Sequence, residues 1–300
     1  MIRAFLCMAA MASLTACGGS NPFAETPEDD GTGTVPEAIA GNLKSLSYDA
    51  SAQTVTAQIW ALDSTPVEVV YQRNAAKDIG DYEAYSVQED SLDRFFVAVV
   101  GESQDGSVQA GLAGDGGQFN RVLQGAFYQR NGNFDAPPIG TGPAAGQVSY
   151  AGDYAGILNG GTTPAGAPAV DDSILPGEPL LVSGQILINA NFADMAVNGG
   201  IYNRQIVLNT PFALQDLSLI VTDIEADGSF VGDVETHGEV EQDRGDYGGV
   251  FGGTDSAAVA GALFAENHEE NLDNEQEYGF FVLTQCGLAG DAALCDNAAP

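Results

Sequence analysis

Basic residues are scarce in this chain: nine Lys and Arg residues face 42 Asp and Glu residues, which gives a formal net charge of −33 at pH 7. Its only lysines are Lys44 and Lys77. Binding to nucleic acid or to an anionic lipid surface needs a patch of Lys and Arg, and this composition offers none. Charged partners are therefore expected to be basic proteins or cations. A general solubility or salt adaptation of the whole surface is the alternative explanation of the acidity.

Catalytic motifs are absent as well. The sequence has no G-x-S-x-G elbow and no H-E-x-x-H, and the GTGPAAG segment at 140–146 lacks the Lys-Ser/Thr of a phosphate-binding loop. The two histidines, His237 and His268, stand in acidic segments and are predicted to be solvated surface residues. Paired carboxylates are expected by chance in so acidic a chain, and EF-hand spacing is missing. The sequence thus predicts a protein that is not an enzyme and holds no cofactor or metal.

An apolar run long enough to cross a bilayer, about 20 residues, is also missing. Instead, Arg3 precedes the short apolar stretch AFLCMAAMASL, which is typical of a removed secretory signal. The residues LTAC, ending at Cys17, resemble the lipobox of bacterial lipoproteins, in which that cysteine is acylated and becomes the new N-terminus. Gly18 in the next position implies sorting to the outer membrane. An ordinary signal peptide with an accidental cysteine is the alternative.

Two cysteines remain once Cys7 leaves with the signal and Cys17 carries lipid, namely Cys286 and Cys295. Two cysteines in an exported chain usually pair, so a disulfide that pins the C-terminal tail is predicted. A metal-binding pair is the runner-up.

Two stretches rich in Gly and Pro, at 18–42 and 133–146, interrupt the β-rich sequence. Between them lie seven short alternating or β-rich runs, which predict a small sheet domain with Trp60, Phe95 and Phe96 in its core. The chain is therefore divided into a signal peptide at 1–16, a lipid-anchored tether at 17–42, an N-terminal β domain at 43–132, a linker at 133–145, a barrel domain at 146–286 and a tail at 287–300.

The C-terminal half predicts eight strands that are joined in sequence order as a meander. In the first of them, Val148, Tyr150, Tyr154 and Leu158 share an apolar face with two glycines, so each strand is expected to have one dry face and one wet face. The predicted strands are 147–158, 180–192, 195–202, 216–224, 229–236, 246–253, 257–266 and 277–285. The fold class is thus all-β: an eight-stranded antiparallel up-and-down barrel preceded by a small N-terminal sheet domain.

The dry faces are expected to fill the barrel interior and not to face lipid. The chain already has a predicted lipid anchor, it ends in DNAAP and not in an aromatic strand end, and several strands are shorter than the roughly 9–11 residues that span a membrane.

The segments VSYAGDYAGIL and YGGVFGGTDSAAVAGALFAE resemble the barrel-lobe signature of transferrin-binding protein B-like lipoproteins, a group that includes factor H binding proteins. The match rests on Phe251, Gly252, Ala257 and Gly261, and it covers residues 146–286. The usual glutamate before the last glycine is absent, and the chain has one barrel lobe where the transferrin binder has two. The resemblance implies a barrel preceded by a β "handle" domain on a lipid anchor. It does not carry over transferrin binding, because those contacts lie in loops with no match here.

Successive connections in such a meander alternate between the two ends of the barrel, and the odd-numbered ones are all long here. They gather many carboxylates at one end, which is predicted to be the contact surface for a basic protein or a small ligand. The candidate binding residues are Asp171, Asp172, Glu239, Glu241, Asp243, Glu269, Glu270 and Asp273.

Two classes of function remain open. The first is an outer-membrane, lipid-anchored binding protein whose acidic loops capture a ligand. The second is a structural envelope lipoprotein without a diffusible ligand.

Overall fold

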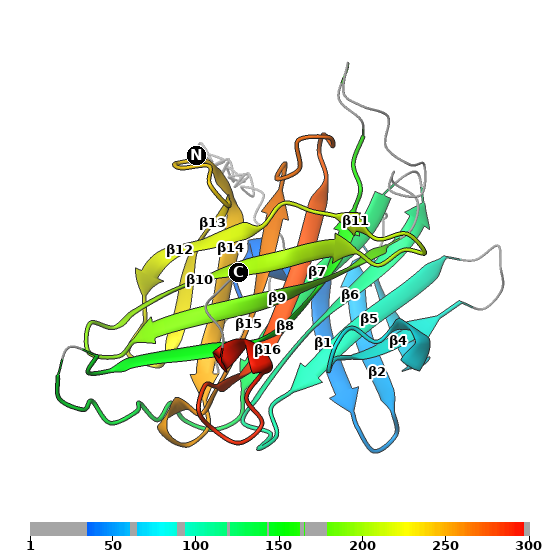
Figure 1. Ribbon diagram of the computed structural model, residues 1–300. Helices are drawn as coiled ribbons and strands as arrows, with labels where there is room; N and C mark the ends of the chain where they lie inside the picture. Colours follow the sequence, from blue (N-terminus) through cyan, green and yellow to red (C-terminus); the bar gives the residue numbers. More distant parts are fainter. Residues whose placement is uncertain are drawn as a thin grey trace, which may run out of the picture.

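The computed structural model describes residues 35–60, 65–88, 94–118, 121–142, 144–162, 165 and 179–296. Their regular secondary structure is almost entirely β-strand, arranged as two sheets that lie against each other (Figure 1). The helical segments of this part of the chain are single turns: α1 (Glu37–Ala40), η1 (Ala75–Lys77), η3 (Thr254–Ser256) and η4 (Ala293–Asp296). No helix among the described residues is long and apolar enough to cross a membrane. Cys17 and the rest of the predicted signal peptide lie outside the described residues.

The N-terminal sheet has seven antiparallel strands in sequence order. Its two ends approach each other, because the Asn42 amide donates to the Gln124 carbonyl at 2.9 Å while the Asn42 carbonyl accepts from Trp60. The sheet is therefore rolled up around a small core of its own, which contains Val55, Tyr71 and Tyr85. The strands are β1 (Leu43–Asp49), β2 (Thr54–Trp60), β3 (Pro66–Arg73), β4 (Glu83–Val87), β5 (Phe95–Glu102), β6 (Val108–Gln118) and β7 (Arg121–Arg130).

The three aromatic residues assigned to this core are only partly buried. Phe95 and Phe96 pack against apolar clusters on opposite faces of β5. Trp60 lies half-buried at the end of β2, with the Lys44 ammonium 5.8 Å from its ring centre.

The second sheet is a closed barrel of eight antiparallel strands, as the sequence predicts. Each strand pairs with its neighbour in the chain, and β16 returns to β8 with Tyr278 opposite Ile157. A two-residue strand, β11 (Phe212–Ala213), adds to the end of β10. The barrel strands are β8 (Gln147–Asn159), β9 (Leu180–Asn191), β10 (Ala196–Ile206), β12 (Leu217–Asp223), β13 (Ser229–Thr236), β14 (Asp243–Gly252), β15 (Ala258–Glu266) and β16 (Gln276–Gln285).

One apolar cluster contains side chains from all eight barrel strands, so it must fill the interior. Glycines make room for its rings. A Cβ at Gly249 would lie 2.5 Å from the ring of Phe230, and a Cβ at Gly261 would lie 2.4 Å from the ring of Phe281. The dry faces thus point inward, as predicted, and the outer side of β9, β10 and β13 carries exposed polar residues such as Asn189, Asn198 and Asp233. In a transmembrane barrel, by contrast, the apolar faces point outward to the lipid.

The expectation of a wet outer face on every barrel strand is wrong for β8, β14, β15 and β16. Their outward side chains form a second apolar cluster with the N-terminal sheet, in which Ile157, Val250 and Phe280 meet Val99 and Leu112, all fully buried. Nearly continuous apolar runs such as AVAGALF in β15 are typical of strands that are buried on both faces. The alternation rule therefore fails where the sheet covers the barrel.

A tyrosine also joins the two sheets by hydrogen bonds. The Tyr82 hydroxyl donates to the Asp153 carbonyl of β8 at 2.7 Å and accepts the Val282 amide of β16 at 2.9 Å. Its burial raises the pKa of this hydroxyl, so the group stays protonated and able to donate.

The C-terminal tail is closed by a disulfide between Cys286 and Cys295, which confirms the predicted pairing. The Cys286 amide donates to the Ser149 carbonyl, so the tail begins directly beside β8.

Candidate functional site

The long connections of the barrel lie at one end of it. Strands of a closed meander alternate in direction, so the connections β10–β12 (207–216), β13–β14 (237–242) and β15–β16 (267–275) share one end with the start of the β8–β9 connection. The short turns at 192–195, 224–228 and 253–257 lie at the other end. We call the first end the mouth and the second the turn end. Asp171 and Asp172 belong to the β8–β9 connection but lie outside the described residues.

Four of the predicted binding carboxylates at the mouth are exposed: Glu241, Asp243, Glu270 and Asp273. Glu239 is partly buried and forms an ion pair with Arg244 at 2.8 Å, which leaves it less able to meet a partner. Arg204 is buried, so Arg244 is the one cation of the described barrel strands that reaches the surface. The solvent-facing charge of the mouth is accordingly negative.

Glu269 is placed differently from its neighbours, because its side chain is only 9% exposed. Its carboxylate accepts the Gln215 amide at 2.7 Å and lies 3.8 Å from the Arg204 guanidinium. This residue belongs to the interior of the mouth, and Glu270 is the surface residue of the pair.

The outer face of β13 and β14 extends the negative surface of the mouth. Asp233 stands directly opposite Asp246, and Glu235 stands opposite Asp243. Like charges that face each other across a ladder destabilise it. Partial burial and the nearby charges of Asp243 and Asp233 raise the pKa of Asp246. The pairing of Glu235 with Asp243 could not be predicted from the sequence, because it depends on a register shift between Val234 and Glu235.

Removing one charge from this ladder is expected to stabilise the fold. We expect Asp246→Asn to raise the free energy of unfolding by about 0.2–1 kcal/mol at low salt, because Asp233 loses its like-charged neighbour. The pKa of Asp246 is raised, so the repulsion between Asp246 and Asp233 grows as pH rises through that pKa. The gain in stability should therefore shrink at acid pH. It should also shrink in high salt, which screens the two charges. Urea unfolding measures it. Asp194→Asn, at an exposed turn residue, is the control, and an equal gain there would contradict the explanation.

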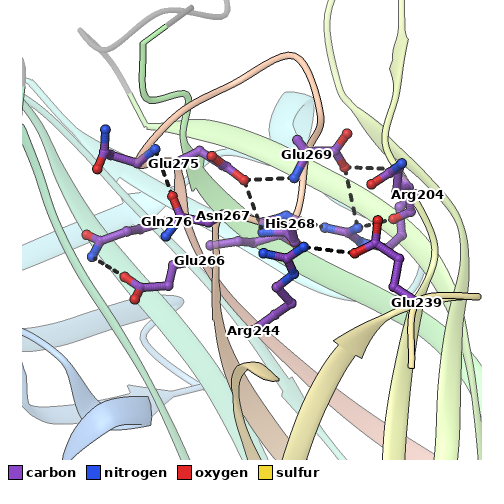
Figure 2. Close-up of polar contacts among 12 residues, drawn as sticks. Arg204, Glu239, Arg244, Glu266, Asn267, His268, Glu269, Glu275 and Gln276 are labelled. Atoms are coloured by element: carbon purple, nitrogen blue, oxygen red, sulfur yellow. Dashed lines mark hydrogen bonds and ion pairs between the residues drawn. The ribbon is translucent and has the colours of Figure 1, made fainter. Parts of the chain in front are cut away.

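Beneath the mouth lies a cluster of buried charged residues, part of which is drawn in Figure 2. Arg204 of β10 donates to Glu277 of β16 at 2.5 Å, and both side chains are fully buried. The Tyr154 hydroxyl of β8 donates to the other oxygen of Glu277 at 2.6 Å. Burial opposes the ionisation of Glu277, but the Arg204 charge, the neighbouring His268 ring and the Tyr154 hydrogen bond outweigh it and lower the pKa of Glu277 to about 2. This ion pair therefore persists at all ordinary pH values.

His268 belongs to the same cluster, so the prediction of a solvated surface histidine is wrong for it. Its ring is 1% exposed, with Nε2 3.1 Å from Arg204 Nη2 and 3.3 Å from Glu277 Oε2. Its burial arises because Arg204 and Glu277, on strands distant in sequence, provide polar partners inside the barrel end. His237, by contrast, is exposed as predicted and contacts Ser218.

The last two members of the cluster are Glu275 and Glu269, both on the β15–β16 connection. Glu275 is fully buried and accepts the Glu269 amide at 2.8 Å. Burial raises the pKa of both carboxyl groups above the usual range. No group of three or more His, Cys, Asp or Glu residues among those described is arranged to hold a metal ion.

A groove of about 330 Å³ lies at the junction of the two sheets, away from the mouth. Asp81, Glu102, Asp153 and Asp291 line it, and the disulfide-closed tail forms part of its wall. Partial burial raises the pKa of Asp153, whose carboxylate accepts the Asp81 amide. The groove is thus negative like the mouth, but the Asp153 carboxylate already accepts a hydrogen bond within the fold.

Comparison with known proteins gives likeness of fold. No protein-family model and no curated protein matches the chain. Among solved structures it is similar to an intact Ap-TbpB with N and C lobes, at 13% identity and a TM-score of 0.38 over 79% of this chain and 53% of that one. It is similar to a transferrin-binding protein B mutant from Haemophilus parasuis Hp5, at 14% identity and a TM-score of 0.40 over 81% of this chain and 42% of that one. It is also similar to the isotype 1 transferrin-binding protein B from serogroup B Neisseria meningitidis, at 12% identity and a TM-score of 0.35 over 81% of this chain and 52% of that one. The chain spans about half the length of these structures or less.

Proposed function

We propose that this chain is a lipid-anchored binding protein of the outer membrane, which presents its acidic mouth to a basic protein or small ligand. The observation that carries the proposal is the collection of exposed carboxylates on the long connections at one end of the barrel, including Glu241, Asp243, Glu270 and Asp273. Long connections on a rigid scaffold are where binding residues are usually found. The anchor rests on the lipobox-like residues before Cys17, and its attachment to the membrane leaves the barrel free to meet a partner.

The carboxylate ladder of β13 and β14 supports the same proposal. Asp233 and Asp246 face each other without a cation between them, which costs stability in the free protein. A basic partner that bound along this face would relieve the repulsion on binding. Surface charge of this kind speeds the encounter with an oppositely charged partner and makes binding sensitive to salt.

A pair of matched triple variants tests the proposal with a lysine decapeptide as the probe. We expect Glu241→Gln, Glu270→Gln and Asp273→Asn together to weaken binding roughly five- to tenfold at low salt, since exposed charges contribute about 0.2–1 kcal/mol each. The melting temperature should change little, because all three side chains are exposed. The measurement is titration calorimetry at two salt concentrations.

The control removes the same number of charges from the turn end, as Asp194→Asn, Asp223→Asn and Glu225→Gln, all exposed residues. Binding that survives in this control and falls in the mouth variant supports the proposal. Equal losses in both would mean that only the net charge matters. No binding by the parent protein would favour the structural envelope role.

A further inference from the structure

His268 stands between the buried ion pair and Glu275. Its Nε2 lies 3.1 Å from Arg204 Nη2 and 3.3 Å from Glu277 Oε2. Nδ1 faces Glu275, with 3.7 Å to Oε1, and makes no hydrogen bond. The other oxygen of Glu275, Oε2, is buried and also without a partner.

The charges of the cluster do not balance when all its carboxyl groups are ionised. Arg204 supplies one positive charge, while Glu277, Glu269 and Glu275 supply three negative ones. Tyr154 of β8 adds only a hydroxyl donor, and Arg244 and Glu239 neutralise each other as an ion pair (Figure 2). An uncompensated buried charge is costly, and groups in this position neutralise by binding a proton.

This imbalance bears on one loop in particular. His268, Glu269 and Glu275 all belong to the β15–β16 connection at 267–275, whose tip carries the exposed Glu270 and Asp273. Inward attachments of this loop include the Gln215–Glu269 hydrogen bond, the contacts of His268, the backbone pairing of Asp273 with Thr162 and the side chain of Leu272, which is buried in the interior cluster. The charge state of the buried side of the loop therefore contributes to how firmly its exposed side is held.

We propose that the β15–β16 loop is a proton-dependent latch, closed when the buried Glu275 carboxyl holds a proton on its unpartnered Oε2 and released when that proton is lost. With the proton in place, Glu275 is neutral, and the buried excess of negative charge is reduced. Once it leaves, Glu275 is an ionised carboxylate with an unpartnered oxygen, and hydration of that group draws the loop outward. A consequence for binding, which rests on the proposed function, is that Glu270 and Asp273 lose their fixed position as pH rises.

The direction of the pH dependence follows from linkage. The pKa of Glu275 is raised in the fold by burial, so this group stabilises the closed loop at low pH, and that contribution is lost as pH rises through the raised pKa. Glu277, with its pKa lowered to about 2, keeps its charge throughout and does not contribute to the transition.

Hydrogen exchange of the intact chain, corrected for intrinsic exchange rates, tests the latch between pH 5 and 9. We expect protection of residues 268–275 to fall at least tenfold as pH rises, while β15 and β16 stay protected. Glu275→Gln keeps the oxygen that accepts the Glu269 amide but cannot ionise, so its loop should stay protected at high pH. Glu270→Gln, in the same loop but exposed, is the matched control and should keep the parent's pH profile.

A flat profile in the parent protein, or an unchanged profile in Glu275→Gln, would overturn the latch. If Glu275→Gln does not fold, NMR of the parent protein decides: the backbone amide signals of residues 268–275 should change together with pH, and those of β15 and β16 should not. Lysine-decapeptide binding separates the two proposals. Absence of binding at every pH contradicts the proposed function and leaves the exchange result standing, whereas binding with a flat exchange profile contradicts the latch alone.

Discussion

Arg204→Met is expected to lower the free energy of unfolding by about 3–5 kcal/mol, which is the usual cost of leaving one partner of a buried ion pair unpaired. Arg204 and Glu277 are both fully buried and 2.5 Å apart, and no other arginine or lysine among the described residues pairs with Glu277. The variant would leave Glu277 buried with the Tyr154 hydrogen bond and the nearby His268 ring, but without the guanidinium charge. Urea unfolding at pH 7 measures the loss.

Two further variants show whether the loss comes from the pair. Adding Glu277→Leu to Arg204→Met should recover a large part of the stability, because no charge is then left without a partner. Arg244→Met removes a half-exposed arginine from its pair with Glu239 and should cost less than about 1 kcal/mol. A double variant as unstable as the sum of the two single ones would mean that the residues act independently.

The acid dependence of the same pair has a definite sign. The pKa of Glu277 is lowered in the fold to about 2, so its stabilising contribution is present above the ordinary carboxyl pKa and is lost as pH falls towards 2. In Arg204→Met the pKa of Glu277 rises, because burial is no longer opposed by the guanidinium. The stability difference between parent and variant should therefore shrink below about pH 4.

Cys17→Ser is expected to release the protein from the membrane fraction completely. The proposed anchor, which rests on the lipobox-like LTAC, has its lipid on Cys17, and a serine hydroxyl cannot take a thioether-linked lipid. Cell fractionation and intact-protein mass measure the result, with loss of the lipid mass expected together with loss of membrane attachment.

Cys7→Ser is the matched control, since this cysteine lies within the predicted signal peptide at 1–16 and should be removed with it. It should leave both attachment and mature mass unchanged. A Cys17→Ser protein that stays in the membrane fraction with its lipid mass intact would mean that the anchor lies elsewhere.

Much of the fold could be predicted because the signal in each strand is local. Alternating residues such as Val148, Tyr150 and Tyr154 identify a strand and its inner face without any knowledge of its neighbours, and the Asp, Gly and Ser turns fix where each strand ends. The eight barrel strands accordingly lie within a few residues of their predicted bounds. The cross-sheet core was missed because Ala155 or Ala260 on an outward position is compatible with either solvent or a covering sheet.

The site was harder to predict than the fold. Glu269 and Glu270 are adjacent acidic residues in one loop, and no local pattern tells which of them turns inward. That choice depends on Gln215 and Arg204, which come from a strand and a connection some 50 to 65 residues earlier in the chain. Arg204 carried no clear signal either, because it lies beyond the predicted strand 195–202 and between the polar residues Asn203 and Gln205.

The β16–β8 pairing has a consequence for the order in which the molecule can assemble. Strand β16 is the last strand that the structure describes, and it both closes the barrel against β8 and packs against β6 of the N-terminal sheet. During synthesis the N-terminal residues are made first. The seven-stranded sheet has its own core and is therefore complete long before β16 is made. The barrel meanwhile has open edges at β8 and β15. Pairing across so great a sequence separation is slow, so closure by residues 276–285 is expected to be the rate-limiting event of folding.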